Sequence, residues 1–378
     1  MSSVRILYFT RDYTSHDYRF LTALAKTGYE VHYLRLESRG YPLEDRSLSP
    51  EIEQVHWAGG RGRFSWRDSP RLLGDLKRVI RILKPDLIQA GPLQTAAFLV
   101  ALTGFRPLVS MSWGYDLLLD ADRNAFLRWA TRYTLRHSTA MIGDCNTIRQ
   151  RAEGFGMPAE RIVTFPWGVD LQHFVYKRDQ SPVISDQWAA QDAEARQPFT
   201  LLSTRGWEPI YGVELIARAY VQAVHQRPEL RLLMLGNGSQ APLIHRIFKD
   251  AELENRVSFP GHVGYTDLPR YYRSADLYVS ASHSDGSSIS LLEAMACGCP
   301  TLVSDIPGNR EWVTPGVQGW WFRDGDVNAL EQAVVHAVEE RSCLPEMGRA
   351  ARALAEQRAD WDKNYPELLK AYKIAFNS

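Results

Sequence analysis

Short apolar runs alternate with longer segments of helical periodicity along almost the whole chain. A repeated strand–helix–strand order of this kind builds parallel sheets that are covered by helices. In the first part of the chain the expected strands are Val4–Phe9, Val31–Leu36, Val55–Ala58, Asp86–Ala90, Pro107–Ser112, Thr139–Ile142 and Arg161–Phe165. The helices expected between them are His16–Lys26, Pro70–Leu83, Thr95–Thr103, Asn124–Arg136 and Cys145–Glu153.

The alternation stops at about Asp170–Arg196, which is rich in Gln, Asp and Ser, and then restarts. Because 378 residues exceed one ordinary core, we expect an amino-terminal domain of residues 1–170, a linker of 171–197 and a carboxyl-terminal domain of 198–360. The later strands are expected at Phe199–Ser203, Arg231–Leu235, Arg256–Phe259, Leu277–Ser280, Thr301–Val303 and Gly319–Phe322. The later helices are expected at Val213–Gln226, Ala241–Leu253, Leu268–Arg273, Ile289–Ala296, Val327–Glu339 and Glu346–Gln357. The tail, Trp361–Phe376, predicts a last amphipathic helix that packs back on the first domain.

The composition limits the class of protein. A hydrophobic content of 45% and a charged content of 23% are typical of a globular chain. The first residues lack a signal-peptide pattern, and the longest apolar stretch, Thr95–Phe105, is too short to span a bilayer. The four cysteines have no zinc spacing, so we expect free thiols in a reducing, cytoplasmic compartment.

The most informative segment runs from Ser282 to Pro300. It follows an expected buried strand and contains a loop of Gly and Ser before a helix that begins near Ser288. Unpaired backbone N–H groups at such a helix start suit a diphosphate, and Gly286 lets the backbone come close to it. Glu293 repels phosphate but is placed to hold neighbouring hydroxyls, such as those of a ribose. The alternative is a structural helix start with serine caps and a glutamate that favours the helix dipole.

This segment resembles the signature of glycosyltransferase family 4, retaining enzymes of the GT-B fold. Asp285 is followed by seven residues and then by Glu293-Ala-Met-Ala-Cys-Gly-Cys-Pro, as in the family pattern. The resemblance implies an α/β protein of two doubly wound Rossmann-like domains with an inter-domain cleft. Other segments similar to family landmarks follow in the expected order: Pro166–Asp170, Leu235–Gly238, Arg256–Gly264 and Leu268–Ser280.

The resemblance also implies roles for single residues. Arg205 would contact the donor phosphates, Asp285 would face the donor sugar and Glu293 would hold the ribose, so these three are the candidate catalytic residues. An arginine suits phosphate because it is always charged and binds in a bidentate manner. The implied donor-binding residues are Gly236, Gly238, His262, Val263, Gly286, Ser287, Ser288, Ile289 and Ser290.

Three positions depart from the family pattern. Asp285 replaces a glutamate, and its shorter reach is expected to change the sugar preference. Tyr211 stands where the family usually has a lysine, so one charged contact worth roughly 1.5–3 kcal/mol is missing. Trp113-Gly-Tyr-Asp116 replaces His-Gly-x-Asp, and the indole of Trp113 either stacks on a sugar or fills the strand end. Trp113, Asp116 and Tyr211 are therefore candidate acceptor or sugar contacts.

Two basic stretches with aromatic residues lie in the first half, Arg61–Arg67 and Arg123–Arg136. Arginines with Trp and Phe suit an anionic membrane surface. The alternative is a solvated helix face whose aromatic side chains belong to the core. The stretches form no nucleic-acid motif and the isoelectric point is about 7.2, so we expect no nucleic-acid partner.

Together these patterns predict a retaining, metal-independent hexosyltransferase without a cofactor. Its donor would be a nucleotide sugar, a UDP-sugar before GDP-mannose, and its acceptor a glycan or lipid-linked molecule in polysaccharide or glycolipid synthesis. A catalytically weak or inactive sugar-nucleotide-binding partner subunit is the alternative. A dinucleotide-binding dehydrogenase is disfavoured because the turn at Gly236 lacks the third glycine. An epimerase is disfavoured because no acid–base set is visible.

Overall fold

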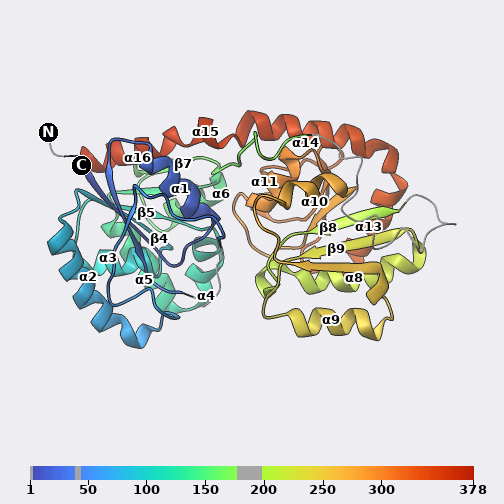
Figure 1. Cartoon of the computed structure of the whole chain (residues 1–378), viewed down its shortest axis with the longest axis horizontal. Coiled ribbons are helices and arrows are strands. Elements are labelled where there is room, and N and C mark those ends of the chain that lie inside the picture. Colours follow the sequence, from blue (N-terminus) through green and yellow to red (C-terminus); the bar gives the residue numbers. More distant parts are fainter. Residues whose placement is uncertain (1–2, 39–43, 177–197) are drawn as a thin grey trace. The chain divides into compact units, whose positions relative to one another are not determined.

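The computed structural model describes residues 3–38, 44–176 and 198–378. The chain divides into two compact units (Figure 1). Unit one is Met1–Pro166 together with Tyr365–Ser378, and unit two is Trp167–Asn364. Residues 177–197 of the expected linker lie outside the described residues. Each unit has its own parallel sheet flanked by helices, which confirms the predicted fold class of two doubly wound domains.

Unit one contains a seven-stranded sheet in the order β3-β2-β1-β4-β5-β6-β7. Its strands are β1 (Arg5–Thr10), β2 (Glu30–Arg35), β3 (Glu53–Gln54), β4 (Leu87–Gly91), β5 (Leu108–Met111), β6 (Ala140–Gly143) and β7 (Ile162–Thr164). Its helices are α1 (Ser15–Ala25), η1 (Trp66–Asp68), α2 (Ser69–Leu83), α3 (Ala96–Thr103), η2 (Asp116–Asp120), α4 (Ala121–Arg123), α5 (Ala125–His137), α6 (Asn146–Gly154), η3 (Ala159–Arg161) and α16 (Pro366–Phe376). Because β1 pairs with both β2 and β4, the strand order reverses between β1 and β4.

The last helix completes unit one. The buried residues of α16 recur at helical spacing and pack on the sheet at β4 to β7. The hydroxyl of Tyr372 donates a 2.6 Å hydrogen bond to Oε1 of Gln89 in β4. The expectation of one continuous helix over Trp361–Phe376 is wrong, because the chain forms α15 (Trp361–Asn364) and then restarts at Pro366. A proline is accommodated at the first turn of a helix but not in its interior.

Unit two contains a six-stranded sheet in the order β10-β9-β8-β11-β12-β13. Its strands are β8 (Phe199–Ser203), β9 (Leu230–Leu235), β10 (Val257–Gly261), β11 (Leu277–Ser280), β12 (Thr301–Ser304) and β13 (Gly319–Phe322). Its helices are η4 (Pro209–Tyr211), α8 (Val213–Gln226), α9 (Ala241–Asp250), η5 (Glu254–Arg256), α10 (Leu268–Ser274), α11 (Ile289–Ala296), α12 (Pro307–Arg310), α13 (Val327–Glu339), η6 (Arg341–Cys343), α14 (Leu344–Arg358) and α15. Here the strand order reverses between β8 and β11, the place where open α/β sheets bind ligands.

A glycine fixes the start of α8 beside this reversal point. Gly212 has φ +56°, and a Cβ added there would lie 2.3 Å from the carbonyl oxygen of Ala281. Only glycine therefore lets the loop after β8 lie directly against the loop after β11. The amide of His283 also donates to the carbonyl of Ile210 across these two loops, at 2.9 Å.

One strand expectation in unit one is wrong. The strand that pairs with β2 is Glu53–Gln54, and residues 55–58 form no strand, although the amide of Val55 still donates to the carbonyl of Tyr33 at 2.8 Å. The reason is the side chain of Trp57, which turns into the core, donates from Nε1 to the carbonyl of Arg35 at 2.8 Å and packs edge-on to Phe9. The short helices η2 and α12 were not expected from the sequence pattern.

The cysteines and the helix lengths match the expectations for the described residues. All four cysteines are free thiols, and Cys145, Cys297 and Cys299 are buried. No helix in residues 3–38, 44–176 or 198–378 is both long and apolar enough to cross a bilayer.

Candidate functional site

The candidate site lies at the carboxyl ends of β8 and β11 in unit two. Arg205 follows β8, and Asp285 and Ser288 follow β11. These residues come from motifs about 80 positions apart in the chain, and the reversal of strand order brings them together.

The side chain of Arg205 links the two loops. Its Nη2 donates to Oδ2 of Asp285 at 2.7 Å. Its Nη1 donates to Oγ of Ser288 at 2.9 Å and to Oγ of Ser290 at 3.1 Å. The hydroxyl of Tyr278 also donates to Oγ of Ser290, at 2.8 Å. The arginine that is predicted to contact phosphate is therefore held at the start of α11 by side-chain oxygens that accept its hydrogen bonds. Phosphate oxygens would accept the same hydrogen bonds.

Burial and pairing act together on the charges of this ion pair. Burial works against the charge of Arg205, but the facing carboxylate of Asp285 raises the arginine pKa above its ordinary value, so the guanidinium stays charged. Burial raises the pKa of Asp285, although Arg205 and hydrogen bonds from the Ser288 side chain and the Gly286 amide oppose that shift.

The ring of Tyr211 packs on one face of the Arg205 guanidinium. The Cζ atom of Arg205 lies 4.0 Å from the centroid of the Tyr211 ring, which is within the range of a cation–π contact. Where the resemblance implies a lysine, this chain has an aromatic ring that packs on the guanidinium of Arg205. The sequence had placed Tyr211 among the candidate acceptor or sugar contacts and did not indicate this packing on Arg205.

The start of α11 has no side-chain cap. Ser288 is the N-cap residue, but its side chain accepts no hydrogen bond from the first turn. Ser287 is held from behind, because its Oγ accepts from Nε1 of the buried Trp312 at 3.0 Å. The first-turn N–H groups, which include those of Ile289 and Ser290, thus keep the orientation that suits an anion.

A glycine that the sequence pattern did not single out supports this loop. A Cβ on Gly308 in α12 would lie 2.3 Å from the carbonyl oxygen of Asp285 and 2.5 Å from that of Gly286. The only local signal was the dipeptide Pro307-Gly308 directly after a strand pattern.

Glu293 lies further along α11 and is almost completely buried. The hydroxyl of Tyr272 in α10 donates to its Oε2 at 2.9 Å, and the same hydroxyl lies 3.0 Å from Oγ1 of Thr204. Burial and the nearby Glu293 raise the pKa of Tyr272 well above its ordinary value, so the phenol remains a donor. Tyr272 was not among the predicted site residues.

Two of the predicted donor-binding glycines have a packing role. A Cβ on Gly238 would lie 2.4 Å from the carbonyl oxygen of Trp207, and Gly236 has φ +88° beside the carbonyl of Arg205. They let the turn after β9 lie against the loop that carries Arg205. Their direct contact with a donor stays a prediction, as does that of His262 and Val263, which follow β10.

Unit one contains the candidates Trp113 and Asp116. Asp116 is fully buried, and its carboxylate accepts hydrogen bonds from the amides of Leu93, Trp113 and Leu117 and from the hydroxyl of Ser112, at 2.7 to 3.0 Å. Burial raises the pKa of Asp116 to about 6, although these hydrogen bonds oppose the shift. The geometry favours a role in holding the loop after β5, and direct contact with an acceptor stays a prediction.

Trp113 itself is partly exposed. Its ring lies edge-on to the imidazole of His16 at the start of α1, with centroids 5.2 Å apart. The two side chains lie at the carboxyl ends of β5 and β1, where this sheet would bind a ligand.

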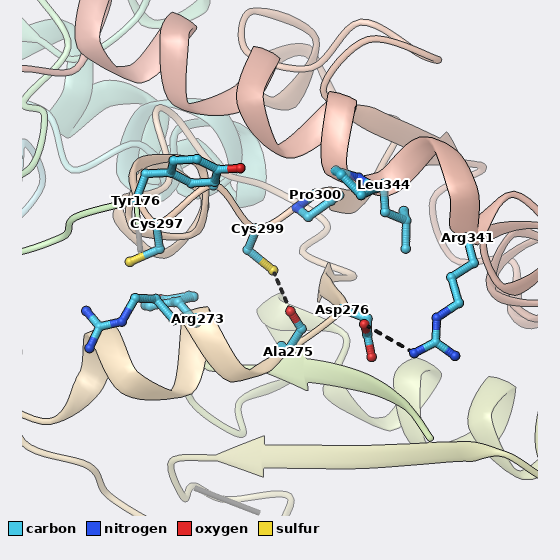
Figure 2. Close-up of a pocket in the computed structure, with 12 residues that line it drawn as sticks. Tyr176, Arg273, Ala275, Asp276, Cys297, Cys299, Pro300, Arg341 and Leu344 are labelled. Atoms are coloured by element: carbon cyan, nitrogen blue, oxygen red, sulfur yellow. Dashed lines mark hydrogen bonds and ion pairs between the residues drawn. The ribbon is translucent and has the colours of Figure 1, made fainter. Parts of the chain in front are cut away.

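A separate cavity of about 230 Å³ lies at the amino ends of β11 and β12, and Figure 2 shows the residues that line it. It is lined in part by Asp276, Cys297, Cys299 and Arg341. Asp276 pairs with Arg341 at 3.6 Å, and burial raises the pKa of Cys297 to about 12 and that of Cys299 further, so both thiols stay protonated. The cavity lies at the end of β11 opposite to the loop that carries Asp285, although Tyr272, which binds Glu293, also lines it.

No group of three or more His, Cys, Asp or Glu side chains within the described parts of the chain is arranged to hold a metal ion. The charged groups of the site are Arg205, Asp285 and Glu293. They suit the binding of an anion beside hydroxyl groups.

Two family models match the chain. The model for glycosyl transferases group 1 matches residues 185–358, and the model for Glycosyltransferase Family 4 matches residues 15–173. The UDP-N-acetylglucosamine–peptide N-acetylglucosaminyltransferase GtfA subunit of Streptococcus gordonii is 28% identical over 61% of the chain, which spans only 44% of that protein. A GDP-mannose-dependent phosphatidylinositol monomannoside mannosyltransferase of Corynebacterium glutamicum is 23% identical over 84% of the chain and 82% of that protein.

Solved structures share the fold over nearly the whole length. Anabaena HepE in complex with UDP-glucose has a TM-score of 0.77 and 19% identity, covering 98% of this chain and 99% of that one. Sucrose-phosphate synthase from Thermosynechococcus elongatus has a TM-score of 0.79 and 19% identity, covering 99% of both chains.

Proposed function

The chain belongs to glycosyltransferase family 4 and has the GT-B fold, and from this premise we propose that it transfers a hexose-type sugar from a nucleotide-diphosphate donor to an acceptor hydroxyl. The observation that carries the proposal is the meeting of Arg205 with the uncapped start of α11, next to the buried carboxylate of Glu293. A cation and unpaired N–H groups bind a diphosphate, and a nearby carboxylate binds the paired hydroxyls of a ribose.

We propose a UDP-sugar as the first donor and GDP-mannose as the next. The HepE structures are complexes with UDP, with UDP and glucose, and with UDP-glucose, whereas the corynebacterial relative is a GDP-mannose-dependent enzyme. Asp285 is the residue expected to face the sugar, so its short side chain is the feature to vary when the donor is sought.

The proposed chemistry depends on stabilising the departing diphosphate. As the sugar–phosphate bond breaks, negative charge grows on the leaving oxygen, and Arg205 and the first-turn amides of α11 stabilise it. Arg205 donates to the hydroxyls of Ser288 and Ser290, and in the proposed complex the donor phosphates replace these hydroxyls as its partners. The proposal assigns no step to a metal ion, and the product keeps the anomeric configuration of the donor.

Tyr211 modifies this chemistry. It contributes no positive charge to the leaving group, and it covers one face of the arginine that does. We expect slower turnover than a lysine at this position would give, without loss of donor binding.

The acceptor is proposed to be a glycan or a lipid-linked molecule in polysaccharide or glycolipid synthesis, reached from the cytoplasm or from the inner face of a membrane. The names of relatives include a phosphatidylinositol mannoside and poly(glycerol-phosphate) as acceptors. The second candidate function is an inactive or weak sugar-nucleotide-binding partner subunit. It is favoured by the departures at Trp113 and Tyr211, and a relative is itself named as a subunit.

Turnover of a panel of nucleotide sugars tests the proposal. The full chain should release the nucleoside diphosphate from one donor, and Arg205→Ala and Glu293→Ala should each lower kcat/KM at least about 100-fold. The matched controls are Arg246→Ala and Glu254→Ala, exposed residues of the same unit, which should keep full activity. A thermal shift with a donor but no turnover would support the partner-subunit function instead.

A further inference from the structure

Three large aromatic side chains lie exposed together on unit one. The exposed fractions are 38% for Trp66, 45% for Phe126 and 50% for Trp129. Beneath them lies the buried ring of Phe98 in α3, which makes edge-to-face contacts with all three, at centroid distances of 5.8, 6.2 and 5.4 Å. We call this set, with the arginines described next, the aromatic–arginine surface.

The three exposed aromatic rings of this surface do not belong to the buried core. Phe98 alone is buried, and the other three rings project outward from it along α5 and η1. Figure 1 shows α3 beside α5 in this unit. Contiguous exposed apolar side chains with a polar rim mark interaction sites, whereas scattered ones need no explanation.

The rim of the surface is basic. From Arg123 to His137 the sequence contains four arginines and no acidic residue. Arg132 and Arg136 are exposed and form no ion pair within the described residues. They follow Trp129 by three and seven positions, so they share its side of α5.

Other arginines extend the same charge around Trp66. Between residues 61 and 71 the sequence has four arginines and one acidic residue, Asp68. These arginines, Arg61, Arg63, Arg67 and Arg71, are all exposed and have no ion-pair partner among the described side chains. Arg128 differs, because it turns to Asp122 at 2.8 Å.

We propose that the aromatic–arginine surface docks unit one on an anionic lipid bilayer. The rings of Trp66, Phe126 and Trp129 enter the headgroup region, and the arginines bind lipid phosphates. Tryptophan suits the membrane interface because one part of its ring is apolar and the other donates a hydrogen bond. A bilayer is the partner that fits, since exposed arginines without an ion-pair partner among the described side chains flank the exposed rings.

This inference rests on the proposed function only for its purpose, which is to bring a lipid-linked acceptor within reach. The docking itself is independent of the donor site in unit two. The two ideas can therefore fail separately.

Cosedimentation of the full chain with lipid vesicles tests the docking. The vesicles contain phosphatidylcholine alone, or phosphatidylglycerol as about a third of the lipid, and binding to the second kind only is expected, weaker at high salt. Arg132→Gln with Arg136→Gln should weaken binding about 30-fold, since each surface arginine is worth about 1 kcal/mol. Phe126→Ser with Trp129→Ser should weaken binding and, unlike the arginine variant, should do so at high salt as well.

Matched controls separate docking from general loss of charge or apolar area. Ile82→Ser removes an exposed apolar side chain from α2, and Arg246→Gln removes an exposed arginine from unit two; both should bind as the unchanged chain does. Thermal unfolding of each variant shows that it is folded. Quenching of tryptophan fluorescence by brominated lipids, lost in part in Trp129→Phe, gives a second measurement.

The proposal is overturned if the chain does not bind anionic vesicles, or if all variants bind them equally. It is also overturned if the aromatic variant abolishes self-association in sedimentation instead, which would make the surface a protein interface. Donor-induced thermal shift and donor turnover are measured in the same variants and should be unchanged. Vesicle binding without turnover would contradict the proposed function but would still support the docking.

Discussion

The hydroxyl of Tyr272 donates a 2.9 Å hydrogen bond to Oε2 of Glu293, which ties α10 to the helix that begins at the candidate phosphate site. Removing that hydroxyl in Tyr272→Phe should leave Glu293 less firmly oriented. We expect KM for the donor to rise roughly three- to tenfold with little change in kcat, and the unfolding free energy to fall by about 1 kcal/mol.

Tyr220→Phe is the control for this prediction. Its hydroxyl is also buried in unit two and donates to the carbonyls of Leu230 and Arg256 at 3.0 and 3.1 Å. It should lose similar stability with no change in KM. An equal rise in KM in both variants would mean that Tyr272 acts on stability alone.

Arg205 and Asp285 should depend on each other for stability. Arg205→Ala leaves the partly buried carboxylate of Asp285 without its cation, which should lower the free energy of unfolding by about 1–3 kcal/mol. Adding Asp285→Asn to that variant should restore much of the stability but none of the turnover. Denaturant unfolding and donor kinetics of the two single variants and the double variant measure both effects, and simple additivity of the stability losses would contradict the pairing.

Tyr211→Lys should speed the reaction. A lysine at this position adds a charge to the leaving diphosphate, and we expect kcat to rise about tenfold. Tyr211→Leu is the matched variant, because it removes the ring without adding a charge, and it should lower kcat/KM. If Tyr211→Lys is slower than Tyr211→Leu, the ring contact with Arg205 matters more than the missing charge.

Gly308→Ala should weaken donor binding by displacing the loop that carries Asp285 and Gly286. A Cβ there meets the carbonyl oxygens of Asp285 and Gly286, so the loop before α11 must shift. A loss of the donor-induced thermal shift is expected. Gly154→Ala, where a Cβ meets nothing within 4 Å, should leave that shift unchanged.

Stability should fall as pH rises through the weakly acidic range. Burial raises the pKa of Asp17 from 3.8 to about 7, although hydrogen bonds from Thr14 oppose the shift. Between these two values the unfolded chain loses the proton and the folded one keeps it, so the free energy of unfolding decreases with pH. Asp17→Asn should flatten this part of the curve measured by denaturant unfolding.

Asp122 is expected to affect the pH dependence of stability in the opposite direction, and Asp122→Asn should remove that effect. Burial acts to raise the pKa of Asp122, but Arg151 and Arg128 bind this carboxylate and lower its pKa overall. This residue therefore stabilises the fold above its ordinary pKa and loses that contribution as pH falls. An unchanged slope in Asp17→Asn would show that another group dominates the weakly acidic range.

The sequence predicted the elements and their order because each has a periodic pattern that ends at a clear signal. The helices at 213–226 and 289–296 begin and end where expected. The strand at 55–58 was wrong because an isolated pattern does not reveal that Trp57 turns inward. The charged residues of the site were found through their motif, whereas Tyr272 and Gly308 were missed because their partners lie 21 or more positions away and share no period with them.

The helix that finishes the amino-terminal sheet is translated only after the whole of unit two. The apolar face of β4 to β7 that receives Leu368, Ala371 and Tyr372 stays uncovered while all of unit two is being made. Unit one, whose strands are translated first, is therefore completed only after unit two has been translated. Premature termination before residue 365 would spoil unit one, although nearly all of its own codons had already been read.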